Sequence, residues 1–115
     1  MDSVLVVDDD PAFSERVVTF LRELLPGREI VAVGDGNAAL TRALDLRPRN
    51  VLLDVSMPGP DGLRVANALA QALPATRIAI ISGEAPDAAA LPDGAVFVRK
   101  DDRLEDALRT LLVDP

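Results

Sequence analysis

The side chains in this sequence that are best suited to chemistry stand where short apolar runs end. Asp8, Asp9, Asp54, Ser82 and Lys100 each follow such a run directly or after one further residue. Three carboxylates, one hydroxyl and one ammonium are typical of a magnesium and phosphoryl site, because Mg²⁺ prefers one or two carboxylates together with water and a phosphate oxygen. The chain has no His and no Cys. This excludes disulfides, thiolate zinc sites and histidine base catalysis, so any metal must be held by oxygen.

Asp54 ends the apolar run Val51–Leu53 and precedes a proline- and glycine-rich turn. An aspartate in this position is also a common turn former, so the residue alone is compatible with a purely structural role. Other acids nearby would favour function, because two carboxylates about 4 Å apart at an effective dielectric near 20 repel by roughly 4 kcal/mol. A divalent cation would relieve this repulsion. Without one, we expect the pKa of at least one of the carboxyls to be raised.

Lys100 is the one lysine among twelve basic residues. A compact ammonium in a chain that otherwise uses arginine favours a point-charge contact to a phosphoryl oxygen, although a lysine after a strand is often simply solvated. Ser82 has a similar alternative, because a hydroxyl at a strand end commonly caps the backbone. The small neighbour Gly83 and the position at the same edge as the acids favour a functional role for Ser82.

Length and charge limit the kind of protein. At 115 residues the chain predicts a single domain, residues 1–115, that can bury a core without staples. The net charge of −7 argues against nucleic acid or an anionic membrane as a direct partner. The sequence shows no signal peptide and no apolar run of membrane-spanning length, so the cytoplasm is the default location.

The chain alternates apolar runs with helical patterns. The five expected strands are Ser3–Val7, Glu29–Val33, Val51–Asp54, Arg77–Ile81 and Ala95–Val98. Helices are expected from Pro11 (capped by Asp10) to Pro26, from about Ala39 to Leu46, from about Asp61 to Pro74, and along the stripe Leu104, Leu108, Leu111 and Leu112. A further helix at Asp87–Leu91, between two prolines, is favoured by its alanines but is too short to be stable alone.

Alternating strands and helices without a linker predict an α/β fold with a doubly wound, five-stranded parallel sheet. Right-handed crossovers bring the carboxyl ends of all strands to one edge. We therefore expect the five polar side chains at the strand ends to converge there, at the edge where ligands bind in open α/β sheets.

Several motifs together resemble the receiver domain of bacterial two-component response regulators. They are Val6–Asp9, Asp54 followed by Met57-Pro58-Gly59 and Asp61-Gly62, Ser82-Gly83, and Phe97 three residues before Lys100. They occur in order along the whole chain. The resemblance implies the flavodoxin-like strand order 2-1-3-4-5 in a three-layer α/β/α sandwich.

The resemblance also implies the roles of the acids. Asp54 is expected to be the phospho-acceptor, with Asp9 and Asp54 as direct Mg²⁺ ligands. Asp8 would act through a water molecule, and the backbone carbonyl of Ser56 would be a further ligand.

The remaining roles concern transfer and switching. Lys100 and Mg²⁺ would stabilise charge on the transferring group, and the Ser82 hydroxyl would be drawn to the new phosphoryl group. Phe97 resembles the family's aromatic switch, although it could equally be an ordinary core or surface residue. Ser56 and Glu84 stand where the family tunes dephosphorylation.

Because the chain has no histidine, the phosphoryl donor implied by the resemblance is a sensor histidine kinase or a small phosphodonor. The output would be a separate protein, an attached effector domain or a second copy of the chain. The Lys100-Asp101 ending is similar to that of receivers attached to DNA-binding domains. Such a domain is a phosphoacceptor rather than an enzyme, with at most self-catalysed transfer and autodephosphorylation.

Two other interpretations stay open. Asp8 and Asp10, with Ser82 and Lys100, loosely resemble the site of a small Mg²⁺-dependent haloacid dehalogenase-type phosphatase, although this leaves the Asp54 stretch without a role. The chain could also be a receiver-like interaction module that signals without phosphate. Whether a phosphodonor adds one phosphate, is turned over or does nothing distinguishes the three.

Overall fold

The computed structural model describes residues 2–55 and 62–113. The strands are β1 (Val4–Val7), β2 (Ile30–Val33), β3 (Asn50–Asp54), β4 (Arg77–Ser82) and β5 (Val96–Arg99). The α-helices are α1 (Pro11–Leu24), α2 (Gly36–Leu46), α3 (Gly62–Ala72) and α4 (Leu104–Val113). Each expected strand and each of the four longer expected helices is therefore present, with boundaries shifted by a few residues.

The five strands form one parallel sheet in the order β2-β1-β3-β4-β5, as predicted. The central strands β1 and β3 are buried along their whole length, while the edge strands β2 and β5 include exposed positions. Runs of Val and Leu without polar alternation suit these central strands because both of their faces are covered by helices.

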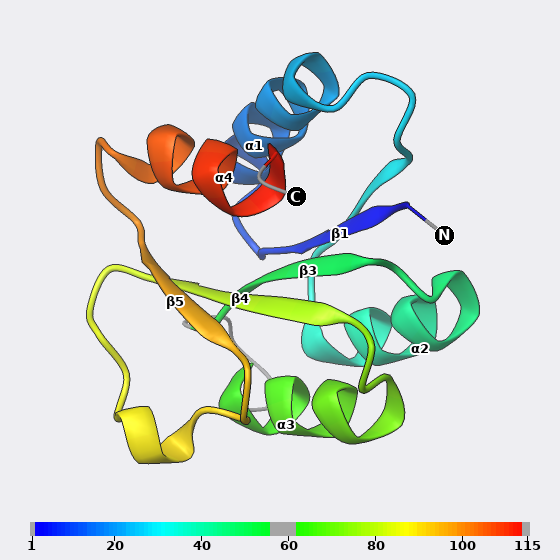
Figure 1. Cartoon of the computed structure of the whole chain (residues 1–115), viewed down its shortest axis with the longest axis vertical. Helices are drawn as coiled ribbons and strands as arrows, with labels where there is room; N and C mark the ends of the chain where they lie inside the picture. The colour runs from blue at the N-terminus through cyan, green and yellow to red at the C-terminus, as the bar shows by residue number, and fades with distance from the viewer. Residues whose placement is uncertain (1, 56–61, 114–115) are drawn as a thin grey trace.

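Helices cover both faces of the sheet (Figure 1). α1 and α4 lie on one face, where Val17, Leu21 and Leu108 pack against Val4 and Val6. α2 and α3 lie on the other, where one apolar cluster joins them to Leu5 and Val7. Successive residues of β1 thus supply the two cores in turn, as the strand repeat requires. The three-layer arrangement is confirmed.

The fourth crossover differs from the prediction. The expected helix at Asp87–Leu91 is wrong in type, because this segment forms a single turn of 3-10 helix, η1 (Ala88–Ala90). The side chain of Asp87 accepts the Ala89 N–H at 3.1 Å, and the Asp87 carbonyl accepts the Ala90 N–H at 2.9 Å. Pro86 and Pro92 leave too little chain between them for a stable α-helix.

Within the residues that the structure describes, no helix is long and apolar enough to cross a membrane.

Candidate functional site

The acidic residues are brought together by neighbouring strands. Asp8 and Asp9 follow β1, Asp54 ends β3, and these strands pair in parallel with Val7 opposite Leu53. One carboxylate oxygen from each of the three aspartates lies within 4.8 Å of the others. Asp8 and Asp54 are 4% and 3% exposed, whereas Asp9 is exposed. The predicted convergence of the three acids is confirmed.

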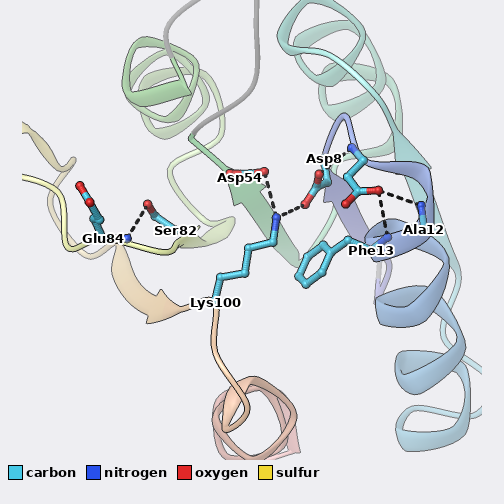
Figure 2. Close-up of polar contacts among 8 residues, drawn as sticks. Asp8, Ala12, Phe13, Asp54, Ser82, Glu84 and Lys100 are labelled. Carbon is cyan, nitrogen blue, oxygen red and sulfur yellow. Dashed lines mark hydrogen bonds and ion pairs between the residues drawn. The ribbon is translucent and has the colours of Figure 1, made fainter.

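Lys100 follows the end of β5, and its side chain reaches across to this cluster (Figure 2). Its Nζ lies 3.3 Å from Asp8 Oδ2 and 3.4 Å from Asp54 Oδ2, and its side chain is 27% exposed. The backbone N–H of Lys100 donates to the carbonyl of Ser82 at 2.9 Å, which continues the β4–β5 pairing to the base of this side chain. The long alkyl chain then spans the edge of the sheet. Lys100 is thus part of the acidic cluster rather than a solvated surface lysine.

The charges in the cluster shift one another's protonation. Burial raises the pKa of Asp8, and the charge of Asp54 raises it further, while the Asp10 N–H and the Lys100 ammonium act in the opposite direction. Burial lowers the pKa of Lys100, but the charges of Asp54 and Asp8 and hydrogen bonds to both outweigh this, so its pKa is raised. The two carboxylates therefore stabilise the protonated, charged form of Lys100.

The loop after β1 is held by its own aspartates. The backbone N–H of Asp10 donates to Asp8 Oδ1 at 2.8 Å. Asp10 in turn caps α1, because its Oδ1 accepts the N–H groups of Ala12 at 3.1 Å and Phe13 at 3.4 Å. The orientation of the Asp8 carboxylate is thus tied to the first turn of α1.

Ser82 and Glu84 lie together beyond the end of β4. Ser82 is buried, and its Oγ accepts the backbone N–H of Glu84 at 3.3 Å, whereas the Glu84 side chain is exposed. This contact is the backbone cap that sequence reasoning gave as the alternative role of Ser82. Ser82 pairs in the sheet with Arg99, the residue before Lys100, so both side chains stand at the same edge (Figure 2).

Phe97 is half-buried on the edge strand β5, and Arg99 Cζ lies 5.7 Å from the centre of its ring. The Arg99 guanidinium also donates to the carbonyl of Gly83 at 2.8 Å. Ser56, whose carbonyl was expected to be a metal ligand, lies outside the described residues, as do Met57, Pro58, Gly59 and Asp61.

Phe13 belongs to the site although sequence reasoning assigned it only to the apolar face of a helix. The Lys100 Nζ lies 3.9 Å from the centre of its ring. The available signal was its position three residues after Asp10, in the first turn of the helix that follows the acidic loop.

The donor set suits a hard divalent cation. Three carboxylates converge within 4.8 Å, and oxygen ligands of this kind are those that Mg²⁺ selects. Two of the acids are buried, so a cation there would offset charge that water screens poorly. The residues fit the expected Mg²⁺ site.

Comparison with known proteins identifies the family. The model of the response regulator receiver domain matches residues 4–104. The chain belongs to this family.

The receiver is 44% identical over 66 residues to the DNA-binding response regulator MtrA of Mycolicibacterium smegmatis, a match that covers 57% of the receiver and 28% of MtrA. It is 41% identical over 98 residues to a protein-glutamate methylesterase/protein-glutamine glutaminase of Myxococcus xanthus, covering 81% of the receiver and 28% of that protein. The receiver thus matches less than a third of the length of each of these two relatives.

Solved structures of other proteins share this fold. The chemotaxis protein CheY4 of Vibrio cholerae is 26% identical with a TM-score of 0.81, and the match covers 96% of each chain. The complex of the histidine kinase ThkA with the response regulator protein TrrA contains a chain that is 29% identical with a TM-score of 0.78, covering 97% of the receiver and 99% of that chain. The acidic cluster of Asp8, Asp9 and Asp54 is the typical acidic pocket of such a domain.

Proposed function

We propose that this receiver accepts a phosphoryl group on Asp54 from a sensor histidine kinase and thereby controls an output protein or an attached effector domain. The observation that carries the proposal is the bridging position of Lys100, whose Nζ lies 3.4 Å from Asp54 Oδ2 and 3.3 Å from Asp8 Oδ2. A basic point charge beside a buried carboxylate at a strand end is suited to phosphoryl transfer. The relative that was crystallised with a histidine kinase supports this class of donor.

In the proposed reaction an Asp54 carboxylate oxygen attacks the phosphorus of a phosphohistidine. The new P–O bond forms as the P–N bond breaks, and the electron pair of that bond returns to the imidazole of the donor. Lys100, already against Asp54, contacts the oxygens of the transferring group and stabilises their charge. Asp8, Asp9, Asp54 and the Ser56 carbonyl would hold Mg²⁺. When bound, Mg²⁺ supplies positive charge to the acids and the phosphoryl group.

The proposed response uses Ser82 and Phe97. The Ser82 hydroxyl would leave the Glu84 N–H, which it now accepts at 3.3 Å, and donate to the phosphoryl oxygens. Phe97 would then move inward behind the displaced loop. The position of Glu84 beside this hydroxyl, and that of Ser56 after the acceptor, make these two residues the proposed regulators of dephosphorylation.

Three further points belong to the proposal. Residues 1–115 act as a single receiver domain in the cytoplasm, where a kinase can reach it. Asp54 is consumed and regenerated in a signalling cycle, so the domain is not an enzyme that turns over a separate substrate. The output is a partner protein, a fused effector domain or a second copy of the receiver.

A small acyl phosphate tests the proposal. With Mg²⁺ present, the donor should add a single phosphoryl group, detected by intact-mass spectrometry after trapping of the labile adduct. Asp54→Asn should remain unlabelled, and chelation of Mg²⁺ should suppress labelling of the wild type. Equal labelling of Asp54→Asn would exclude the assigned acceptor. Continuous release of phosphate would instead indicate a phosphatase, and no labelling would indicate an interaction module.

The switch needs its own test. Ser82→Ala should still be phosphorylated, but the change in the Phe97 ring signals on phosphorylation should shrink. The chain has three Phe and no Tyr or Trp, which makes those signals simple to assign by NMR. A wild-type response of the ring in Ser82→Ala would remove Ser82 from the switch.

A further inference from the structure

The ammonium of Lys100 has a third neighbour that is neutral. The Phe13 ring centre lies 3.9 Å from Lys100 Nζ, well inside the roughly 6 Å range of cation–π attraction. Figure 2 shows the ring beside the lysine side chain, with the carboxylates of Asp8 and Asp54 at the ammonium end. Lys100 is thus held by groups from the loop after β1, the end of β3 and the first turn of α1.

Phe13 is placed by the same loop that orients Asp8. Its backbone N–H donates to Asp10 Oδ1 at 3.4 Å, and the Asp10 N–H donates to Asp8 Oδ1 at 2.8 Å. Phe13 is half-buried in the first turn of α1 and packs against the core on that face of the sheet. The helix cap therefore places the Phe13 backbone beside the acidic loop, and packing against the core restricts the side chain.

The two carboxylates alone are unreliable partners for Lys100 during phosphoryl transfer. Both would be drawn to Mg²⁺, and Asp54 loses charge at one oxygen when that oxygen bonds to phosphorus. Until the phosphoryl oxygens reach it, a lysine that loses these partners regains the conformational freedom of its long side chain. A neutral aromatic face keeps its attraction for the ammonium throughout and adds no negative charge that would repel the incoming phosphoryl group.

We propose that Phe13 is a positioning residue that holds the Lys100 ammonium in the acidic pocket while Asp54 is phosphorylated. This inference rests on the function proposed above. Phe13 does not contact the reacting atoms in this role, and it acts only through Lys100.

Three variants test the proposal. Phe13→Leu keeps an apolar side chain but removes the aromatic face, so labelling of Asp54 by a small acyl phosphate with Mg²⁺ should slow about threefold to tenfold. Phe13→Trp should restore most of the rate. Phe20→Leu is the matched control, because Phe20 lies on the same helix and its ring faces Arg109, at 5.5 Å, instead of Lys100. Its rate should stay at the wild-type value.

NMR gives a readout of position that a general loss of stability would not move. Lys100 is the only lysine, so selective labelling of lysine gives one Cε–Hε signal. The ring should shift this signal upfield in the wild type. The shift should be lost in Phe13→Leu, retained in Phe13→Trp and unchanged in Phe20→Leu. The double variant Phe13→Leu/Lys100→Met should be labelled at the same rate as Lys100→Met alone, because Phe13 acts only through Lys100.

The outcomes separate this inference from the proposed function. Suppose that wild-type Asp54 is labelled but Phe13→Leu reacts at the wild-type rate. The positioning role is then wrong and the acceptor assignment stands. The same conclusion follows if Phe13→Leu slows labelling by the same factor in a Lys100→Met background as in the wild type. An unshifted lysine signal in the wild type also overturns the role. If Phe20→Leu slows as much as Phe13→Leu, the effect belongs to α1 packing and the inference fails. If the wild type is not labelled at all, the function and the inference fail together.

Discussion

The surroundings of Asp8 act on its pKa in opposite directions. It is buried, it lies near the charge of Asp54, and it is partly compensated by the Asp10 N–H and by Lys100. The net effect is a raised pKa. A carboxyl with a raised pKa in the folded state holds its proton over a range in which the unfolded chain has already released it.

The first prediction follows from that sign. In a chelator, the free energy of unfolding should fall as pH rises from the ordinary aspartate pKa of 3.8 through the raised pKa of Asp8. Asp8→Asn keeps an oxygen for the Asp10 N–H but removes the charge, so this pH dependence should weaken and the variant should be more stable than wild type at neutral pH. Urea melts across pH measure both. Suppose that Asp8→Asn is less stable than wild type and its free energy of unfolding depends on pH as in the wild type. The charge of Asp8 then does not destabilise the folded state.

Lys100→Arg is the second prediction. The ammonium fits between two carboxylates while resting on the Phe13 ring. A guanidinium keeps the charge but is longer, planar and forked, so it cannot occupy all three contacts. We expect slower phosphorylation of Asp54 or a reduced structural response. The measurement is labelling by an acyl phosphate, with Arg103→Lys, at an exposed position, as the control for exchanging the two side-chain types.

The charged residues of the site could be predicted from the sequence, but the part played by the Phe13 ring could not. Asp8, Asp9, Asp54 and Lys100 could be placed together because each ends a strand of one parallel sheet. Phe13 could not, since an aromatic residue at helical spacing is usually core, and only the side-chain geometry shows which face of the ring meets Lys100.

Among the elements, the start of α3 lies very close to the residue that follows β3. A Cβ added to Gly62 would lie 2.5 Å from the Cα of Val55, the residue that follows the end of β3. Backbone atoms cannot give way at that distance, so only glycine allows α3 to begin beside the end of β3. The Asp61-Gly62 pair of the sequence motif thus has a steric reason at its second residue.

Gly62→Ala is therefore the third prediction. Displacing the start of α3 should destabilise the fold by about 1–3 kcal/mol, as overpacking generally does. Gly83→Ala is a suitable control, because an added Cβ there meets nothing within 4 Å. Urea denaturation of both variants and wild type provides the comparison. Equal stabilities of Gly62→Ala and Gly83→Ala would show that the end of β3 can move aside.

The elements themselves were largely predictable from pattern. Apolar runs gave the strands, and Asp10-Pro11 gave the start of α1, because these signals are local. The fourth crossover depended on two competing effects, the helical propensity of its alanines and the short span between Pro86 and Pro92. The second effect prevailed, and propensity alone could not show that one 3-10 turn was enough to connect β4 to β5.

For the whole molecule, the acidic pocket links metal binding to folding. The ligands come from the ends of β1 and β3, which are far apart in the sequence, so the site exists only when the sheet is formed. A cation that binds the folded state and not the unfolded chain stabilises the fold by mass action.

The fourth prediction is that Mg²⁺ at neutral pH stabilises the receiver by about 2.7 kcal/mol at a hundredfold excess over its dissociation constant. Asp8→Asn and Asp9→Asn should each gain less. Urea melts with Mg²⁺ or with sodium chloride of matched ionic strength distinguish specific binding from screening. A full gain in both variants would place the cation elsewhere.

The single 3-10 turn between β4 and β5 has a consequence for local opening. Between Gly83 and Ala95, η1 is the one helical turn that the structure describes, and Asn67 Nδ2 ties it to α3 through the Ala90 carbonyl at 3.2 Å. Beside it lies a groove of about 390 Å³, lined by residues such as Ala70, Gln71 and Ala95. Leu91 and Ala95 pack against the apolar cluster on this face, but the β4–β5 pairing lies outside the stretch. We therefore expect it to separate from α3 while the sheet stays intact. Its amide protons should therefore exchange with solvent far faster than those of β1 and β3, at a rate almost independent of dilute denaturant, and Asn67→Ala should speed that exchange while leaving the global melt nearly unchanged.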